Sequence, residues 1–389
     1  MIDAARVAID AAALVRVPSV TGDERAVMEE LVRRAAALGL EATLVEHDLA
    51  ALRAHPDHPG EEAPRTELVG VEVVRPRPGA PRLALCGHLD VVGPGEEEWD
   101  AWSGRVADGR LHGRGAADMK GAVAAALHAL AVAEDPPCEV ALLAVASEED
   151  GGLGAFAALE RDSAWDACLI PEPTGFAVAC AQAGALTFRG VVPGVAAHAA
   201  ARLEGVSALD RYLPVHAALA DYERRVNAEV DHPLMRELPL PYPVLVGRLA
   251  AGKWSSTVPD RLEFEGRVGV PLGAAPAAVR IEVEEVVAAA CPEATLSWTG
   301  GQFASGETSP NHPFARLVHD ELAAATGGSA FVGVPYGADM RLFCARGIPC
   351  VMAGTPGLEL AHARDERVRV DDLARLARVM TRIIEQYRG

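Results

Sequence analysis

The sequence contains no long uninterrupted apolar run and no pair of cysteines at the spacing of a redox or zinc motif. Asp3, Arg6 and Asp10 interrupt the opening residues, so we expect neither a secretory signal peptide nor a membrane anchor. The seven cysteines are an odd number without a Cys-x-x-Cys spacing. They are typical of buried thiols in a reducing compartment, and we therefore expect a cytoplasmic protein.

Basic residues are also scarce. The chain has 36 lysines and arginines against 55 aspartates and glutamates, which gives a formal net charge of −19. Nucleic-acid binding depends on cationic side chains that neutralise phosphates, so this balance argues against a nucleic-acid partner. A glycine-rich loop with a lysine that could cradle a phosphate is missing too, which argues against a phosphohydrolase.

The length and composition are those of a compact enzyme. With 389 residues the chain exceeds the usual size of one hydrophobic core, so we expect two domains. Half of the residues are hydrophobic and 23% are charged, which is typical of a globular protein rather than a disordered chain.

Short apolar runs alternate with helical patterns in both the first and the last part of the chain. This alternation predicts an α/β fold with a mostly parallel sheet flanked by helices. The expected strands are 83–86, 140–146, 168–170 and 348–353, and the expected helices are 119–134, 152–160, 313–326 and 371–387.

The middle of the chain has a different pattern, with longer strands that alternate apolar and polar residues. We predict that 184–297 is a smaller α+β sandwich inserted into a larger domain formed by 1–183 and 298–389. The expected strands of the insertion are 184–193, 242–250, 258–270 and 294–298, and its expected helices are 206–229 and 275–290.

Two segments near the N-terminus have distinct local signals. Thr21, followed three residues later by Glu24, predicts the N-cap of a helix that ends before Gly39. Segment 49–66 is rich in proline, histidine and glutamate, which predicts a surface loop.

The first chemical motif is Cys86-Gly87-His88-Leu89-Asp90, at the end of an expected strand. Asp90 lies on the same strand face as His88, where it could orient the imidazole of a metal ligand. The second motif, 113–121, places Asp118 at the start of an alanine-rich helix. Asp118 alone could equally be a helix cap.

Further acidic residues follow other expected strands. Glu148-Glu149 precedes a glycine-rich turn, Glu172 lies between two prolines, and His362 occurs late in the chain. Open α/β sheets place their sites at the carboxyl ends of strands, so we expect these side chains to meet. Imidazole and carboxylate ligands without thiolates indicate a hydrolytic metal site.

In this order and spacing the motifs resemble the co-catalytic zinc peptidases and deacylases. That family includes acetylornithine deacetylase, succinyl-diaminopimelate desuccinylase, aminoacylase and carboxypeptidase G-type enzymes. The resemblance covers essentially the whole chain, and 205–216 is most similar to the acetylornithine deacetylase branch. Ser147 departs from the family, which commonly has Asp there. The resemblance implies that the inserted domain serves as a lid and forms a homodimer.

The resemblance also implies the ligand set of two divalent metal ions, with zinc first and cobalt or manganese as alternatives. Asp118 would bridge the two metals. His88 and Glu172 would complete the ligands of one metal, and Glu149 and His362 those of the other. The Asp118–Met119 peptide bond would be cis.

The remaining roles are implied in the same way. Glu148 would be the general base for a water activated by the metals, and Asp90 would orient His88. His198 of the inserted domain would reach the site of a neighbouring subunit and stabilise the oxyanion. Arg267 and Arg341 would hold a substrate carboxylate.

The expected activity is the removal of an acyl group from an N-acyl amino acid or related amine, as in acetylornithine deacetylase. A dipeptidase or carboxypeptidase would use the same site on the same amide bond, and a small-amide hydrolase is a further alternative. A metal-free binding protein that kept the fold is disfavoured, because no expected ligand and no base is missing.

Overall fold

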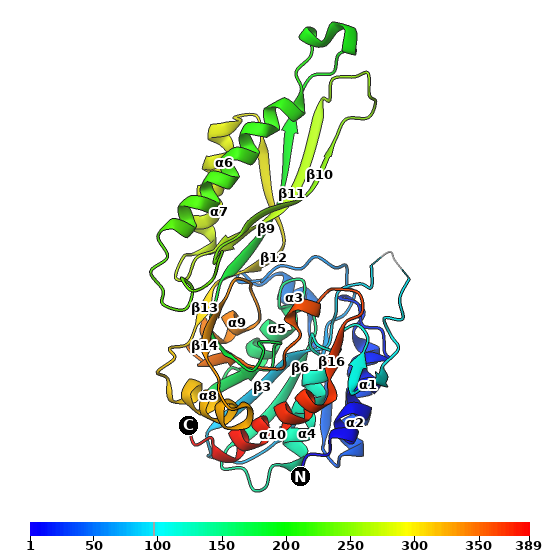
Figure 1. Cartoon of the computed structure of the whole chain (residues 1–389), viewed down its shortest axis with the longest axis vertical. Helices are drawn as coiled ribbons and strands as arrows, with labels where there is room; N and C mark the ends of the chain where they lie inside the picture. The colour runs from blue at the N-terminus through cyan, green and yellow to red at the C-terminus, as the bar shows by residue number, and fades with distance from the viewer. Residues whose placement is uncertain (96–97) are drawn as a thin grey trace. The chain divides into compact units, whose positions relative to one another are not determined.

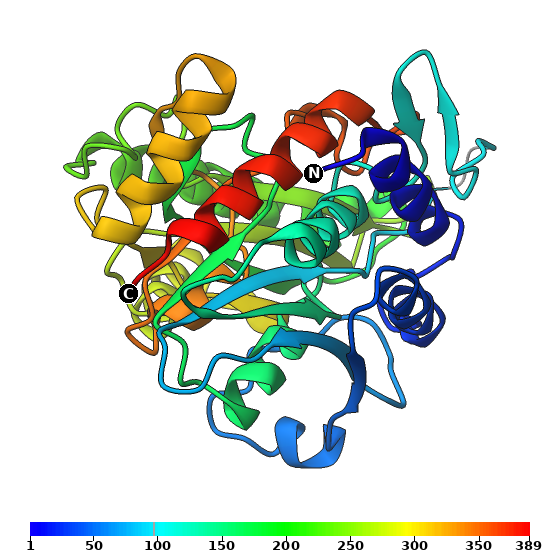
Figure 2. The ribbon, with the colours of Figure 1, turned by 90° about the horizontal axis from the view of Figure 1, so that it is seen from below.

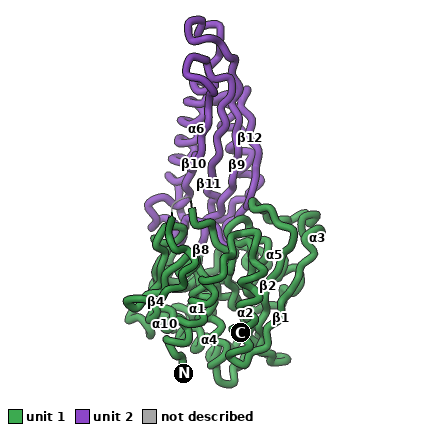
Figure 3. Tube along the Cα trace, turned by 90° about the vertical axis from the view of Figure 1, so that its right-hand side faces the viewer, with its two compact units in different colours: residues 1–180, 307–332, 339–389 green, residues 181–306, 333–338 purple. Residues whose placement is uncertain are grey.

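The computed structural model describes residues 1–95 and 98–389 (Figure 1). The chain divides into two compact units, coloured separately in Figure 3. Unit 1 comprises Met1–Cys180, Glu307–Val332 and Asp339–Gly389, and unit 2 comprises Ala181–Gly306 and Gly333–Ala338. The inserted segment expected at 184–297 thus lies within unit 2. That unit also contains 298–306, because its last strand continues to Phe303 in register with a neighbour.

A nine-stranded sheet is the centre of unit 1, with the order β1-β2-β6-β3-β7-β15-β8-β13 and β14 paired to β8. Strands β6, β3, β7 and β15 pair in parallel, whereas β1 and β2 are antiparallel additions at one edge. The strands are β1 (Ala42–Glu46), β2 (Val69–Arg75), β3 (Arg82–His88), β6 (Glu139–Val145), β7 (Ala167–Ile170), β8 (Val178–Gln182), β13 (Gly306–Glu307), β14 (Phe331–Val334) and β15 (Cys350–Met352).

The parallel strands are nearly continuous apolar runs because both faces of the sheet are covered. Leu83, Leu85, Leu142 and Leu169 are at most 2% exposed. Figure 2 shows helices on both faces of the sheet, with α10 and α4 on one side and α5 and α3 on the other. The predicted α/β fold with a mostly parallel sheet is confirmed.

The helices of unit 1 follow from their apolar patterns. Helix α4 (Lys120–Val132) is buried almost all round and packs between the sheet, α1 and α10. The exposed side of α10 (Val370–Gln386) is polar, and its apolar residues recur at helical spacing on the buried side. The other helices are α1 (Ala4–Val15), α2 (Arg25–Ala37), α3 (Leu49–Arg53), α5 (Leu153–Arg161), α8 (Pro313–Thr326) and α9 (Met340–Cys344).

A small antiparallel sheet, β16-β5-β4, borders the loop that follows the last 3-10 turn, Leu358–Leu360. Its strands are β4 (Arg105–Ala107), β5 (Arg110–His112) and β16 (Arg367–Arg369). Leu111 and Val368 lie opposite each other and are buried, so this sheet is anchored by its middle positions.

Unit 2 is a four-stranded antiparallel sheet, β10-β11-β9-β12, with two long helices. Phe188, Phe264 and Val283 are at most 1% exposed in its own hydrophobic core. The elements are β9 (Gly184–Pro193), β10 (Val244–Ala251), β11 (Arg261–Val270), β12 (Thr295–Phe303), α6 (Ala208–Ala228), α7 (Pro276–Ala290) and a 3-10 turn, Ala199–Glu204.

Two local predictions were wrong. Thr21 does not cap α2: the N-cap is Glu24, and the Thr21 hydroxyl donates to Asp90 instead. Segment 49–66 is not simply a surface loop, because it contains α3 and the fully buried side chain of Arg65. In both cases a long-range polar partner overrides the local signal.

No helix among the residues described here combines the length and apolar character that crossing a bilayer requires. The seven cysteines are free thiols, and all but Cys344 are buried.

Candidate metal centre

Four segments around the central sheet of unit 1, and the loop that carries His362, bring the expected ligands together. His88 ends β3, and Glu148 and Glu149 lie in the turn after β6. Glu172 follows β7, and Asp118 lies just before α4. These are the carboxyl ends of neighbouring parallel strands and the helix start beside them, where an open α/β sheet forms its sites.

Asp118 belongs to two groups of closely spaced ligand atoms. In the first, His88 Nε2 lies 3.2 Å from Asp118 Oδ1 and 3.8 Å from Glu172 Oε1. In the second, His362 Nε2 lies 3.0 Å from Glu149 Oε2 and 3.8 Å from Asp118 Oδ2. Within each group the ligand atoms lie within 4.8 Å of one another. The Asp118–Met119 peptide bond is cis, as the resemblance implied.

The charges of the centre favour divalent cations. The buried acidic side chains Asp90, Glu148 and Glu172 are at most 9% exposed, and His88 is 2% exposed. Burial raises the pKa of Glu172 well above its ordinary value, and the Asp118 carboxylate beside it raises that pKa further. Buried carboxylates in this number need compensating positive charge, and oxygen and imidazole donors suit two divalent ions that share Asp118.

The raised pKa values of the two histidines also favour the binding of cations. Burial opposes the charged imidazolium, but Asp118 and Glu172 hold the pKa of His88 well above its usual range. The hydrogen bond with Glu149 raises the pKa of His362. Both histidines therefore attract a proton that a bound cation would replace, since metal ligation requires neutral imidazole.

Asp90 contacts both His88 and the turn with the two glutamates. His88 Nδ1 lies 2.9 Å from the main-chain oxygen of Asp90, and 3.7 Å from its carboxylate. The carboxylate accepts hydrogen bonds from the backbone N–H groups of Glu148, at 3.1 Å, and Glu149, at 3.2 Å. The backbone of Asp90 thus fixes the ring of His88, while its side chain holds the turn with the two glutamates.

Glu148 lies in the same turn as Glu149 but belongs to neither group of ligand atoms. Its residue is 9% exposed, and burial raises its pKa well above the ordinary value. A carboxylate that is not a ligand and has a raised pKa is suited to accept a proton near neutral pH.

Glu366 is a positioning residue that the sequence analysis did not single out. Its carboxylate is fully buried and accepts from Arg114 Nη1 at 2.7 Å and from the Asp118 N–H at 3.1 Å. Arg114 Nη2 also donates to the His362 carbonyl at 3.0 Å. An acidic residue close to His362 in sequence was the available signal.

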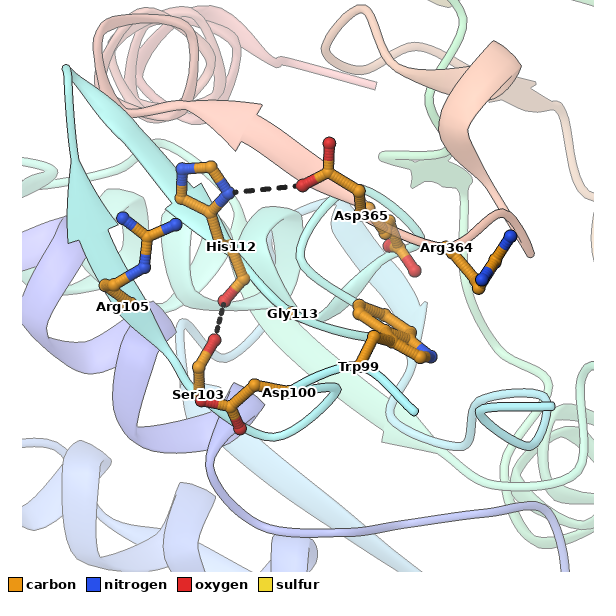
Figure 4. Close-up of a pocket in the computed structure, with 9 residues that line it drawn as sticks. Trp99, Asp100, Ser103, Arg105, His112, Gly113, Arg364 and Asp365 are labelled. Carbon is orange, nitrogen blue, oxygen red and sulfur yellow. Dashed lines mark hydrogen bonds and ion pairs between the residues drawn. The ribbon is translucent and has the colours of Figure 1, made fainter. Parts of the chain in front are cut away.

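Glu366 also lines a cavity of about 450 Å³. Figure 4 shows His112 of β5 facing Asp365, with 3.7 Å between His112 Nδ1 and Asp365 Oδ1. Trp99 forms another wall, and its ring lies 5.3 Å from the Arg114 guanidinium. The loop 362–366 is therefore shared by the metal centre and this cavity.

Arg341 lies beneath the glutamate turn. It is 3% exposed, and its Nη2 donates to the Gly151 carbonyl at 2.6 Å. Asp339, which sequence reasoning missed, is 2% exposed, and its Oδ1 has no hydrogen-bond partner among the described residues. Burial raises the pKa of Asp339 to about 6. Both residues lie at the start of α9 and are buried.

His198 and Arg267 belong to unit 2. His198 is exposed, and its Nδ1 accepts a hydrogen bond from the Ala200 N–H at 3.1 Å. Arg267 of β11 is exposed, with its guanidinium 5.8 Å from the Phe303 ring centroid. It lines a mainly apolar cavity of about 180 Å³ within this unit, together with Leu245 and Tyr336.

Comparisons with known proteins show the family to which the chain belongs. Residues 84–386 match the family described as peptidase family M20/M25/M40. The chain is 30% identical to a succinyl-diaminopimelate desuccinylase of Rhodopseudomonas palustris strain HaA2, with 97% of each chain covered. Its fold is similar to that of aminopeptidase PepT from Bacillus cereus, with a TM-score of 0.74, 20% identity and coverage of 99% of this chain and 98% of the other. It is also similar to a metallo-carboxypeptidase from Sulfolobus solfataricus, with a TM-score of 0.75, 17% identity and coverage of 96% and 97%. The chain therefore belongs to the peptidase family M20/M25/M40.

Proposed function

We propose that this protein is a two-metal amidohydrolase that removes the acyl group from an N-acyl amino acid. The observation that carries the proposal is the pair of ligand groups that share Asp118, with the non-ligand Glu148 beside them. His88 and Glu172 would hold one ion, and Glu149 and His362 the other. Zinc is our first choice of metal, and cobalt or manganese would suit the same donors.

When bound, the metals would polarise the scissile carbonyl and lower the pKa of water from about 15.7 towards ~7. The side chains supply the proton transfers. Glu148 would accept the proton of the attacking water on a carboxylate oxygen and return it to the leaving amine. Asp90 would keep Glu148 in place through the backbone N–H at 3.1 Å.

The preference for an acyl substrate rests on the curated relatives. Several of them carry the name succinyl-diaminopimelate desuccinylase, including relatives from Rhodopseudomonas and Methylobacterium. Arg267 could bind a substrate carboxylate, because it lines a cavity and its guanidinium matches the fork of a carboxylate. N-acetyl and N-succinyl amino acids are therefore the first substrates to test, with acetylornithine among them.

For Arg341 we infer a positioning role, because its buried guanidinium contacts the glutamate turn. A dipeptidase or carboxypeptidase activity is the second candidate, since an aminoacyl group presents the same amide bond to the same centre.

We further propose a homodimer in which His198 of one subunit stabilises the oxyanion in the site of the other. Two observations support this role. His198 is exposed on unit 2, and by the resemblance it corresponds to the inserted-domain histidine that reaches the site of a neighbouring subunit. Mixing His198→Ala with Glu148→Gln under subunit exchange should restore activity. Confirmed exchange without activity would contradict the shared site.

The proposed activity is tested with a panel of N-acyl amino acids and dipeptides, assayed with added zinc or cobalt. We expect amine release from N-acyl amino acids, and at least 10²-fold less from Glu148→Gln, which lacks the proton acceptor. If only dipeptides are hydrolysed, the protein is a peptidase and the proposed deacylase activity is wrong. Equal rates for the wild type and Glu148→Gln would contradict the assigned base.

A further inference from the structure

Arg65 is a buried cation in the segment that precedes β2. Its side chain is 0% exposed, although the surrounding composition is that of a surface loop. Nη1 lies 3.2 Å from the Glu24 carboxylate, and Nη2 lies 3.2 Å from Asp150 Oδ1. An isolated buried guanidinium would be costly, so these carboxylates fix both the side chain and the segment that carries it.

Asp150 joins this segment to the turn with the two glutamates. It directly follows Glu149 in the chain and is 5% exposed. Its Oδ2 accepts from the backbone N–H groups of Glu62, at 3.0 Å, and Ala63, at 2.8 Å. With the two contacts from Arg65 Nη2, at 3.2 and 3.3 Å, three residues of one segment converge on this carboxylate.

The turn itself needs such support. Ser147, its first residue, has φ of 66°, in the left-handed region that costs a residue with a Cβ roughly 1–2 kcal/mol. The Ser147 hydroxyl donates to Asp150 Oδ1. On the other side, the Asp90 carboxylate accepts from the N–H groups of Glu148 and Glu149. The two glutamates are therefore held between two buried carboxylates.

We infer that Arg65 and Asp150 form a clamp that positions Glu148 as proton acceptor and Glu149 as metal ligand. Both are positioning residues: they act through the turn and do not themselves belong to the ligand groups. The inference rests on the proposed function for the roles of the two glutamates. Its physical basis is that a ligand or base must be held within about 0.5 Å of its productive geometry by its neighbours.

A second buried carboxylate in unit 1 provides a matched control. Asp10 is 3% exposed, and its Oδ2 lies 2.7 Å from His128 Nε2, which joins α1 to α4. Asp10→Asn and Asp150→Asn each weaken a buried polar network. Only Asp150 touches the glutamate turn, so general loss of stability and loss of positioning can be separated.

The test compares Asp150→Asn, Arg65→Ala and Asp10→Asn with the wild type. Binding of two Co²⁺ ions is followed by visible absorption, and kcat, KM and Tm are measured alongside. For Asp150→Asn we expect roughly 10–100-fold weaker binding of one Co²⁺, as for other residues that orient ligands. We also expect a fall in kcat with little change in KM. Asp10→Asn should lower Tm alone. Arg65→Ala should regain part of its kcat when guanidinium is added.

Asp150→Asn with cobalt affinity and kcat within twofold of Asp10→Asn would overturn the clamp. Arg65→Ala that binds cobalt as tightly as the wild type would also overturn the clamp. This variant decides the question if Asp150→Asn does not fold. A wild type that binds two Co²⁺ ions but hydrolyses no substrate would contradict the proposed function alone, because the cobalt titration would still test the clamp.

Discussion

The two groups of candidate ligands share Asp118 but differ in their surroundings. In the first, His88 is 2% exposed at the end of a central strand, and its ring is fixed by a backbone oxygen. In the second, the His362 side chain is 54% exposed on a loop where φ is 61°. The first group is built by the sheet, whereas the second depends on a loop and a turn held by more distant residues. We therefore expect one tightly bound and one more easily exchanged metal.

Replacement of the shared ligand should have the largest effect. Asp118→Ala removes the carboxylate that both groups use, so we expect loss of most bound metal and of all detectable turnover. Elemental analysis of the purified variant, with circular dichroism to confirm folding, makes the measurement. Retention of two metals per chain would show that Asp118 is not the bridge and that the two groups are independent.

Glu148→Gln should affect catalysis without affecting either group. It keeps the shape of the side chain but removes the proton acceptor, so we expect turnover to fall by about 10²–10⁴-fold with both metals retained. Metal content and kcat measured on the same preparation test this. If metal is lost as well, Glu148 is a ligand and the division into two groups is wrong.

Asp90→Ala should distinguish the two groups. The variant keeps the main-chain oxygen that contacts His88 but loses the carboxylate that holds the turn with Glu149. We expect roughly 10–100-fold weaker binding of the second metal and a smaller change for the first. Stepwise titration with a chelator measures both. Equal weakening of the two metals would show that the Asp90 side chain supports His88 as well.

The smallest effect is expected at Glu24, which contacts Arg65 behind the turn. Burial raises the pKa of Glu24 from 4.5 to about 7. Between these values the folded state holds a proton that the unfolded state has released, so stability falls as pH rises through this range. For a shift of this size the loss is at most about 3 kcal/mol.

Glu24→Gln removes the titrating carboxyl group. The free energy of unfolding of the variant minus that of the wild type should therefore be larger at pH 8 than at pH 4.5, as measured by urea unfolding at both pH values. A difference between the two proteins that does not change with pH would show that folding does not raise the pKa of Glu24.

The sequence was sufficient for the parallel sheet, because runs such as 83–86 and 140–146 can only be buried between helices. It also indicated that His88, Glu149 and Glu172 would lie at one edge of the sheet, because each follows an expected strand, with Asp118 at a helix start. These inferences depend on local pattern and on the general topology of α/β proteins. The place of His362 in the ligand set came from the family resemblance alone.

The supporting residues could not be predicted in this way. Arg65 lies in a segment whose composition indicates a loop, and its partner Asp150 is 85 positions away. Glu366 holds the N–H of Asp118 from 248 positions away. Such contacts leave no periodic signal, because a single buried hydrogen bond determines them. The hydrogen bonds that the Asp90 carboxylate accepts from the glutamate turn were not predicted for the same reason.

The most direct test of the central claim is a crystal structure of the metal-loaded protein with anomalous data at the zinc edge. The account predicts two anomalous peaks roughly 3.5–4 Å apart. Asp118 should contact both, with His88 and Glu172 at one peak and Glu149 and His362 at the other. A single peak, or two peaks that are not bridged by Asp118, would contradict it.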